Sequence, residues 1–247
     1  MEEDIISNNY ALLVVNYFSL ISRKILKKYK RKFNNLIIDN TQSFFSKPIM
    51  DCYNVYSCRK FFGVPDGSYL IKKGLKQKEL AENKSSKISN FLISSIEFGT
   101  NDVYLENLEN ENRLNNEDIK DMSILTKKLL RNIDYKKVRK KRRKNFLYLH
   151  KKLKDYNEIS VTNKRNTFMI YPFLIKDDGL RKYLIQNKIW VSQWWKYCLE
   201  NENCNEFEKY LSKYLIPLPI DQRYCEQDME YLCNLIMDYI NNKFKIK

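Results

Sequence analysis

The sequence predicts an α/β protein with a parallel or mixed sheet in its first part and a smaller α/β domain at its C-terminal end. Short apolar runs of strand length alternate with basic or amphipathic segments of helix length, which is the pattern of strands connected by helices. The chain has 247 residues, of which 43% are hydrophobic. That is enough to bury a real core in one large domain or two smaller ones.

The first part begins with a strand–helix–strand unit. Residues 11–18 are an apolar run typical of a buried strand, residues 19–33 indicate a basic helix, and residues 36–39 predict the next strand. A crossover of this kind makes the two strands parallel. Further short strands are expected at residues 51–56 and 68–72. The first part therefore contains several strands of one sheet.

The rest of the chain is mostly helical. Interrupted helices are expected between residues 88 and 130, and one long helix over residues 135–156. The later elements expected are a strand at 167–175, a helix capped by Asp177, a short strand at 189–191, an extended segment at 215–220 and an amphipathic helix at 227–240. We divide the chain into residues 1–130, a partial large domain, and 131–247, the long linking helix with the small domain.

The net charge of +15 suits an anionic partner, and the run KKVRKKRRK at residues 136–144 concentrates it. Such a run is typical of a nucleic-acid-binding patch. The solvated face of a long helix explains the run better, because Val138, Phe146, Leu149 and Leu153 supply an apolar side. We favour the second interpretation and do not expect a nucleic-acid partner.

The thiols and the N-terminus favour a cytoplasmic protein. There is one histidine, His150, and no CxxC pair, so a zinc site is not expected. Because the first residues are acidic, a secretory signal peptide is not expected, and the apolar run at residues 11–21 is too short to span a bilayer. Reduced thiols are expected for all six cysteines, which are Cys52, Cys58, Cys198, Cys204, Cys225 and Cys233.

An acid and a lysine follow two neighbouring strands of the expected sheet. Asp39 ends one strand, and Lys60 comes three residues after Ser57, which ends the next. Both side chains would converge at the carboxyl edge of the sheet, where open α/β proteins bind ligands. Pyridoxal phosphate chemistry needs this pair, because the lysine forms a Schiff base with the cofactor and the carboxylate holds the pyridine nitrogen protonated.

The stretch from residue 36 to residue 70 resembles the cofactor segment of the DegT/StrS-type sugar aminotransferases, which are fold-type-I enzymes that use pyridoxal phosphate. The family's Asp-x-x-Gln element is matched by Asp39 and Gln42, and its Ser, Schiff-base Lys and Gly turn by Ser57, Lys60 and Gly67. The order of a YPF strand, a helix, a short strand, an L-P-I segment and a closing helix after residue 171 is also similar.

The resemblance implies a PLP-transferase fold and a function in nucleotide-sugar biosynthesis. Lys60 would be the catalytic residue that binds the cofactor and shuttles a proton. Asp39 would bind the pyridine nitrogen, Gln42 the ring side and Ser57 the phosphate. The partners implied are a keto-sugar or nucleotide-sugar substrate, an amino donor and a second subunit, with no membrane.

Family members carry a further N-terminal part of the large domain before the position of Ala11. Three interpretations therefore stay open. The chain is part of a transaminase that is truncated or completed by a complementing N-terminal half, or it is a catalytically inactive remnant. The third is a basic nucleic-acid-binding protein.

Overall fold

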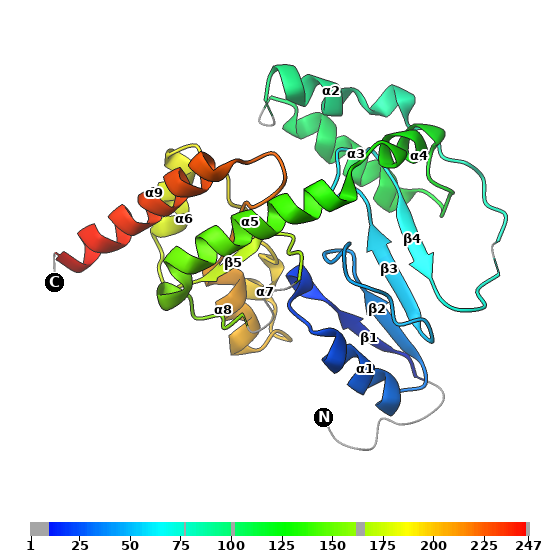
Figure 1. Ribbon diagram of the computed structural model, residues 1–247, viewed down its shortest axis with the longest axis horizontal. Helices are drawn as coiled ribbons and strands as arrows, with labels where there is room; N and C mark the ends of the chain where they lie inside the picture. The colour runs from blue at the N-terminus through cyan, green and yellow to red at the C-terminus, as the bar shows by residue number, and fades with distance from the viewer. Residues whose placement is uncertain (1–9, 77, 100–101, 162–165, 246–247) are drawn as a thin grey trace. The chain divides into compact units, whose positions relative to one another are not determined.

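In the computed structural model, a four-stranded sheet organises the first part of the chain, and its order is β1-β2-β3-β4 (Figure 1). β1 and β3 both pair parallel to β2, whereas β4 pairs antiparallel to β3, so the sheet is mixed as expected. The strands are β1 (Leu12–Val15), β2 (Leu36–Asp39), β3 (Tyr53–Ser57) and β4 (Ser68–Ile71). The structure describes residues 10–76, 78–99, 102–161 and 166–245.

One helix covers part of this sheet. α1 (Arg23–Lys32) begins after Ser22, whose side chain accepts a hydrogen bond from the backbone N–H of Ile25. It ends in three basic residues, which complement the negative end of the helix dipole. Leu26 of α1 belongs to the same buried cluster as Leu36 and Ile38 of β2. The strand–helix–strand unit thus closes on a core of its own.

The first strand is shorter than expected. β1 ends at Val15, and a 3-10 turn, η2 (Tyr17–Ser19), follows it. Asn16 is fully buried, and its side chain donates to Asn40 Oδ1 at 3.0 Å and accepts from the backbone N–H of Ile21 at 3.1 Å. These hydrogen bonds require the chain to turn, so the expected strand at residues 11–18 stops early.

The interrupted helical region contains three α-helices and one short 3-10 turn among the described residues. They are η3 (Ser86–Ile88), α2 (Asn90–Glu97), α3 (Tyr104–Asn116) and α4 (Ile124–Arg131). Ser123 caps α4 by accepting from the backbone N–H of Thr126, and it donates to the buried carboxylate of Asp66 at 3.3 Å. This contact attaches the start of α4 to the turn between β3 and β4.

The chain divides into two units, Met1–Tyr135 and Lys136–Lys247. α5 (Tyr135–Leu153) begins at this boundary and is followed by η4 (Lys154–Tyr156). The second unit also contains β5 (Tyr171–Leu174), α6 (Leu180–Gln186), α7 (Tyr197–Glu200), α8 (Glu206–Tyr214), β6 (Leu215–Leu218) and α9 (Glu226–Lys245).

β5 and β6 form a two-stranded antiparallel sheet in which Pro172 lies opposite Pro217. Both strands are edge strands in this sheet, and an edge is where proline is tolerated. The strand expected at residues 189–191 is absent, and that segment is irregular. Lys188 has a φ of 62°, which ends α6 in a left-handed turn, and the sheet offers the segment no pairing strand in the described chain.

Candidate functional site

Two neighbouring parallel strands place Asp39 and Lys60 at one edge of the sheet. Asp39 is the last residue of β2, and Lys60 lies three residues beyond the end of β3. The backbone after β3 folds into a helical turn, because the N–H groups of Phe61 and Phe62 donate to the carbonyl of Cys58 at 3.1 and 3.0 Å. This turn holds Lys60 beside the carboxyl end of β2.

Thr41 connects the two charged residues. Its backbone N–H donates to Asp39 Oδ1 at 2.8 Å, and its Oγ1 accepts from Lys60 Nζ at 3.3 Å. In the part of the chain that the structure describes, neither Asp39 nor Lys60 belongs to a salt bridge. The carboxylate and the amine are therefore linked through a hydroxyl-bearing turn rather than neutralised by direct contact.

The environment of Lys60 favours its neutral form. Partial burial lowers the pKa of the Lys60 amine from its ordinary value, and the charge of Arg59 acts in the same direction. The charges of Asp39 and Glu111 oppose the shift without cancelling it. The residue still has access to solvent. An accessible amine with a lowered pKa is suited to attack a carbonyl or aldehyde carbon.

Gln42 carries an unsatisfied acceptor. Its Oε1 is buried, yet no described residue donates a hydrogen bond to it. Gln42 stands one residue after Thr41 in the same turn. Buried polar atoms normally have a partner, so an orphaned acceptor in the turn that contains Thr41 fits a ligand that brings its own donor.

Ser57 ends β3 and is 8% exposed, paired in register with Ser68 of β4. The backbone N–H of the next residue, Cys58, donates to the carbonyl of Gly67 at 3.0 Å. Gly67 has a φ of +104°, and a Cβ added there would lie 3.0 Å from Thr126 Cγ2. The expected turn thus requires glycine at this position, both for backbone conformation and for space.

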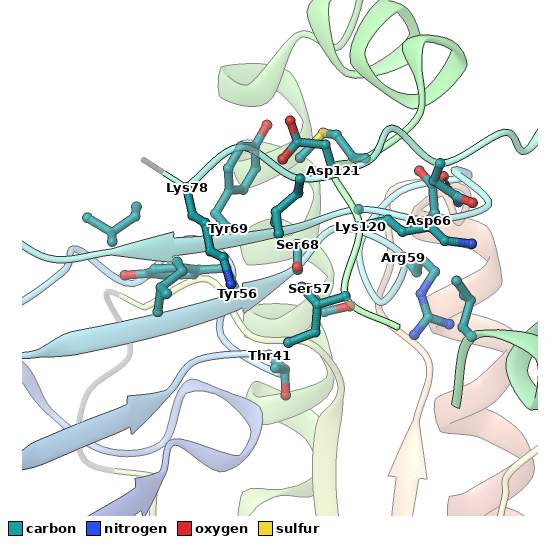
Figure 2. A pocket seen from close by; sticks show the side chains of 18 of the residues that line it. Thr41, Tyr56, Ser57, Arg59, Asp66, Ser68, Tyr69, Lys78, Lys120 and Asp121 are labelled. Carbon is teal, nitrogen blue, oxygen red and sulfur yellow. Dashed lines mark hydrogen bonds between the residues drawn. The ribbon is translucent and has the colours of Figure 1, made fainter. Parts of the chain in front are cut away.

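A pocket of about 1040 Å³ opens beside this turn (Figure 2). Thr41, Ser57 and Lys60 line it together with the exposed edge of β4 and the segment between α3 and α4. Seven basic and four acidic side chains contribute to the lining, which leaves a net charge of 7 − 4 = +3. The basic residues are Arg59, Lys60, Lys72, Lys76, Lys78, Lys120 and Lys127. The pocket is suited to an anionic ligand.

Sequence reasoning did not single out Thr41 or the pocket lysines other than Lys60. Thr41 was detectable in principle, because it lies between Asp39 and Gln42 in the turn that follows β2. The lysines carried no such signal, since the chain has 45 lysine and arginine residues. Arg59 was also missed, and it forms an ion pair with Glu111 of α3.

The described residues contain no group of three or more His, Cys, Asp or Glu side chains arranged to hold a metal ion. No helix among them combines the length and apolar character needed to cross a membrane.

No protein-family model matches the sequence, and no curated protein matches it. Several solved structures share its fold. A DegT DnrJ EryC1 StrS aminotransferase from Brucella abortus has a TM-score of 0.57 at 14% identity, covering 92% of this chain and 63% of its own. DesV of S. venezuelae, solved in complex with a ketimine intermediate, has a TM-score of 0.59 at 12% identity, with 96% of this chain and 67% of its own covered.

A third similar structure is the E. coli GDP-4-keto-6-deoxy-D-mannose-3-dehydratase with bound hydrated PLP. Its TM-score is 0.53 at 15% identity, covering 95% of this chain and 69% of its own. The chain has the fold of the DegT/StrS-type transferases. The fold-type-I class expected from the resemblance is thereby confirmed, with a partial sheet. The chain spans between 63 and 69% of the length of these three structures.

Proposed function

We propose that this chain is part of a pyridoxal-phosphate-dependent aminotransferase that acts on a keto sugar linked to a nucleotide. One observation carries the proposal. Lys60 and Asp39 stand at the ends of adjacent parallel strands, joined through Thr41, in a chain with the fold of such enzymes. The similar E. coli dehydratase holds PLP, and its name specifies a GDP-linked keto sugar. The net positive pocket is compatible with such an anionic substrate.

The residues present fit the cofactor. Lys60 offers an accessible amine with a lowered pKa, Asp39 offers a carboxylate outside any ion pair in the described chain, and Gln42 offers a buried acceptor that lacks a donor. A pyridinium ring, when bound, supplies an electron sink for the carbanion formed at the substrate carbon. None of these three groups is already committed to a structural contact that would exclude this role.

Each residue has a separate task in this proposal. Lys60 Nζ would hold the cofactor's aldehyde carbon and later move a proton to or from the substrate carbon. Asp39 would hold the proton on the ring nitrogen, Gln42 would contact the ring side, and the Ser57 hydroxyl would donate to the phosphate. Thr41 would keep Lys60 and Asp39 in register through its two hydrogen bonds.

The same proposal assigns the domains and the partners. Residues 1–130 would be the partial cofactor-binding large domain, and residues 131–247 the linking helix and small domain of a cytoplasmic protein. β1 has no pairing strand on its outer side in the described chain, and Leu13 of β1 is 57% exposed. We propose that a complementing N-terminal half adds a strand there, because an unpaired parallel edge with apolar side chains is unusual.

A homodimer is the other arrangement that the resemblance implies. α2 and α3 expose several large apolar side chains, which are Ile93, Ile96, Tyr104, Leu105 and Leu108. The mass of the protein in solution, measured by light scattering with and without a co-expressed N-terminal half, separates the two arrangements. A stable complex of unequal chains supports the complementing half, and a mass of twice the chain supports the homodimer.

The function is tested by trapping the cofactor. The protein, alone and with the N-terminal half of a related enzyme supplied in trans, is incubated with pyridoxal phosphate, reduced with borohydride and digested. We expect a pyridoxyl label on Lys60. A label on another lysine would contradict the site assignment. If no label appears in either preparation, the chain is a catalytically inactive remnant.

A further inference from the structure

Arg59 and Lys60 are adjacent residues of the turn that follows β3, and both line the pocket (Figure 2). Their neighbours on either side are buried, since Cys58 is 0% exposed and Phe61 is 2% exposed. The Phe61 ring packs near that of Phe44, with ring centroids 5.9 Å apart. This packing holds the turn in place from its buried side, so the two basic side chains are presented to the pocket together.

Helix α3 provides the acid that pairs with Arg59. Asn110 of α3 is 4% exposed, and its Nδ2 donates to the carbonyl of Pro65 at 2.9 Å. Pro65 belongs to the connection between β3 and β4, which also contains Arg59. Glu111 follows Asn110 in the helix and forms an ion pair with Arg59. The attachment of α3 to this connection therefore sets the position of the Glu111 carboxylate relative to the guanidinium.

The ion pair uses only part of the Arg59 guanidinium. Its Nη1 donates to Glu111 Oε1. No described residue accepts a hydrogen bond from Nη2 or Nε, and neither atom is among the buried polar atoms that lack a partner. Both atoms therefore keep access to solvent. The N–H groups of Nε and Nη2 point in parallel from one edge of the guanidinium, which matches the two oxygens of a carboxylate.

Arg59 differs from the other basic residues of the pocket. It is the only arginine among the described residues that line the pocket, and the other six bases are lysines. An ammonium group attracts anions as a point charge, whereas a guanidinium edge binds two oxygens at once. The Glu111 carboxylate already neutralises part of the Arg59 charge. The free edge is therefore better suited to a singly charged carboxylate than to a doubly charged phosphate.

The guanidinium lies close to the amine of Lys60. Burial is the largest cause of the lowered pKa of Lys60, the charge of Arg59 lowers this pKa further, and the charge of Glu111 opposes the shift. Both members of the ion pair thus act electrostatically on the Lys60 amine. A ligand oxygen bound at Arg59 is accordingly in the same part of the pocket as this amine.

We propose that the edge formed by Nε and Nη2 of Arg59 binds the carboxylate of the α-amino acid that serves as amino donor. This assignment rests on the function proposed above. In an α-amino acid the carboxylate and the amine are attached to the same carbon, so a donor held at Arg59 has its amine in the part of the pocket that contains Lys60. Glu111 is a positioning residue, because it holds Nη1 and thereby orients the free edge.

Carboxylate binding is measured without the cofactor. The full-length, cofactor-free protein is titrated with glutarate at low ionic strength by isothermal titration calorimetry. Glutarate has no amine and no carbonyl group that could react with Lys60. Arg59→Gln should weaken glutarate binding about tenfold or more, because two charge-assisted hydrogen bonds are lost. Arg59→Lys should weaken it nearly as much, because an ammonium keeps the charge but lacks the paired edge.

Two further variants separate carboxylate recognition from general charge and from a structural role. Lys127 also lines the pocket and has an acidic partner, Glu82 at 3.9 Å. Lys127→Gln removes the same charge and should weaken glutarate binding less than about threefold. Glu111→Gln keeps an oxygen that accepts from Arg59 Nη1 but removes the neutralising charge, so it should strengthen binding about two- to fivefold. A purely structural ion pair would give no gain in affinity.

The role of the ligand as amino donor is tested in the complemented enzyme. Arg59→Gln should raise the KM for the donor about tenfold or more and change kcat much less, because the carboxylate contact is made in the ground state and in the transition state alike. Lys127→Gln should leave the KM for the donor within about threefold of the wild-type value.

The proposal is overturned if the wild type does not bind glutarate, if Arg59→Gln and Lys127→Gln weaken binding equally, or if Glu111→Gln weakens it. Titration with inorganic phosphate is the remaining arm, and a dependence on Arg59 for phosphate but not for glutarate would also overturn it. The labelling of Lys60 is a separate result. If Lys60 takes no label while glutarate binding depends on Arg59, the aminotransferase function fails and the carboxylate site remains. If Lys60 is labelled and glutarate binding does not depend on Arg59, only the carboxylate site fails.

Discussion

Two basic side chains, one in each unit, have a pKa that is lowered by burial, and they differ in how their hydrogen-bonding groups are used. Arg142 of α5 is 2% exposed, and its guanidinium donates to Gln222 Oε1 at 2.8 Å and to the carbonyl of Met169 at 2.9 Å. Lys60 makes one longer hydrogen bond, to Thr41 Oγ1 at 3.3 Å. Burial is the largest cause of a lowered pKa in both, and for Arg142 the pKa falls to about 10.

The difference shows that a lowered pKa alone does not identify a reactive group. Arg142 stays charged at neutral pH and uses that charge to hold the segment around Phe168 and Met169 to α5. Lys60 keeps donor capacity and solvent access next to a pocket. A side chain whose hydrogen bonds are saturated by the fold is structural. A side chain at a pocket that keeps unused hydrogen-bonding capacity is a candidate for a catalytic or binding role.

The largest expected effect is the loss of cofactor attachment when Lys60 is replaced. Lys60→Arg should abolish the borohydride-trapped pyridoxyl label, because a guanidinium stays protonated and cannot attack an aldehyde. Lys60→Ala should do the same. Lys78 lines the same pocket, so Lys78→Ala serves as the matched control and should keep the label. If the label survives in the Lys60 variants, Lys60 has a structural role, as Arg142 does.

The next largest effect concerns Asp39. Asp39→Asn should lower the transamination rate of the complemented enzyme by about 100-fold or more, because an amide cannot supply the negative charge that holds a proton on the ring nitrogen. Cofactor binding, followed by titration of absorbance, should fall much less. Asp118→Asn changes a pocket carboxylate outside the Asp39–Thr41–Lys60 connection and should leave the rate nearly unchanged. Equal losses in both variants would argue against the assigned role.

Arg142→Met should destabilise the protein by about 2 kcal/mol, because it removes the donor from buried acceptors while keeping most of the side-chain volume. Arg143 is the adjacent exposed residue, and Arg143→Met should change the free energy of unfolding by less than about 0.5 kcal/mol. Urea denaturation of both variants measures the difference. Equal stability of the two variants would mean that Arg142 belongs to a solvated basic face.

The pH dependence of labelling tests whether the pKa of the Lys60 amine is lowered. Its pKa is lowered below the ordinary 10.5, so the neutral amine appears at lower pH than in an ordinary lysine. Below that pKa, the trapping rate should rise about tenfold per pH unit. The same shift costs stability below the folded-state pKa, and this cost disappears as the pH rises to 10.5. Peptide mapping across pH gives the midpoint, and a midpoint at or above 10.5 would contradict the desolvated environment.

The smallest expected effect is at Ser57. Ser57→Ala should weaken pyridoxal phosphate binding by about 1 kcal/mol, or about fivefold in Kd, if one hydrogen bond to the phosphate is lost. Ser68 pairs with Ser57 in register and is more exposed. Because Ser68 is not assigned a hydrogen bond to the phosphate, Ser68→Ala should change the affinity less than about twofold. If Ser68→Ala weakens binding more than Ser57→Ala in an equilibrium titration, the phosphate contact belongs to β4 and not to β3.

The sequence by itself determined the α/β pattern and the approximate positions of the strands along the first part of the chain. Local periodicity is enough for this, because apolar runs such as residues 36–39 have the length and spacing of buried strands. The positions of Asp39 and Lys60 just beyond two such runs also predicted their common edge. The strand expected at residues 189–191 failed, because a strand needs a pairing partner that local pattern does not specify.

Only the tertiary structure decided which of the many polar and basic side chains are buried, which are hydrogen-bonded and which lack a partner. The link through Thr41, the orphaned Gln42 Oε1 and the burial of Arg142 within a run of exposed charges are all set by packing. Their residue types are common in this chain, so composition and spacing do not distinguish them. Burial and hydrogen-bond saturation depend on neighbours brought in by the fold, which is why these properties appear only when the chain is folded.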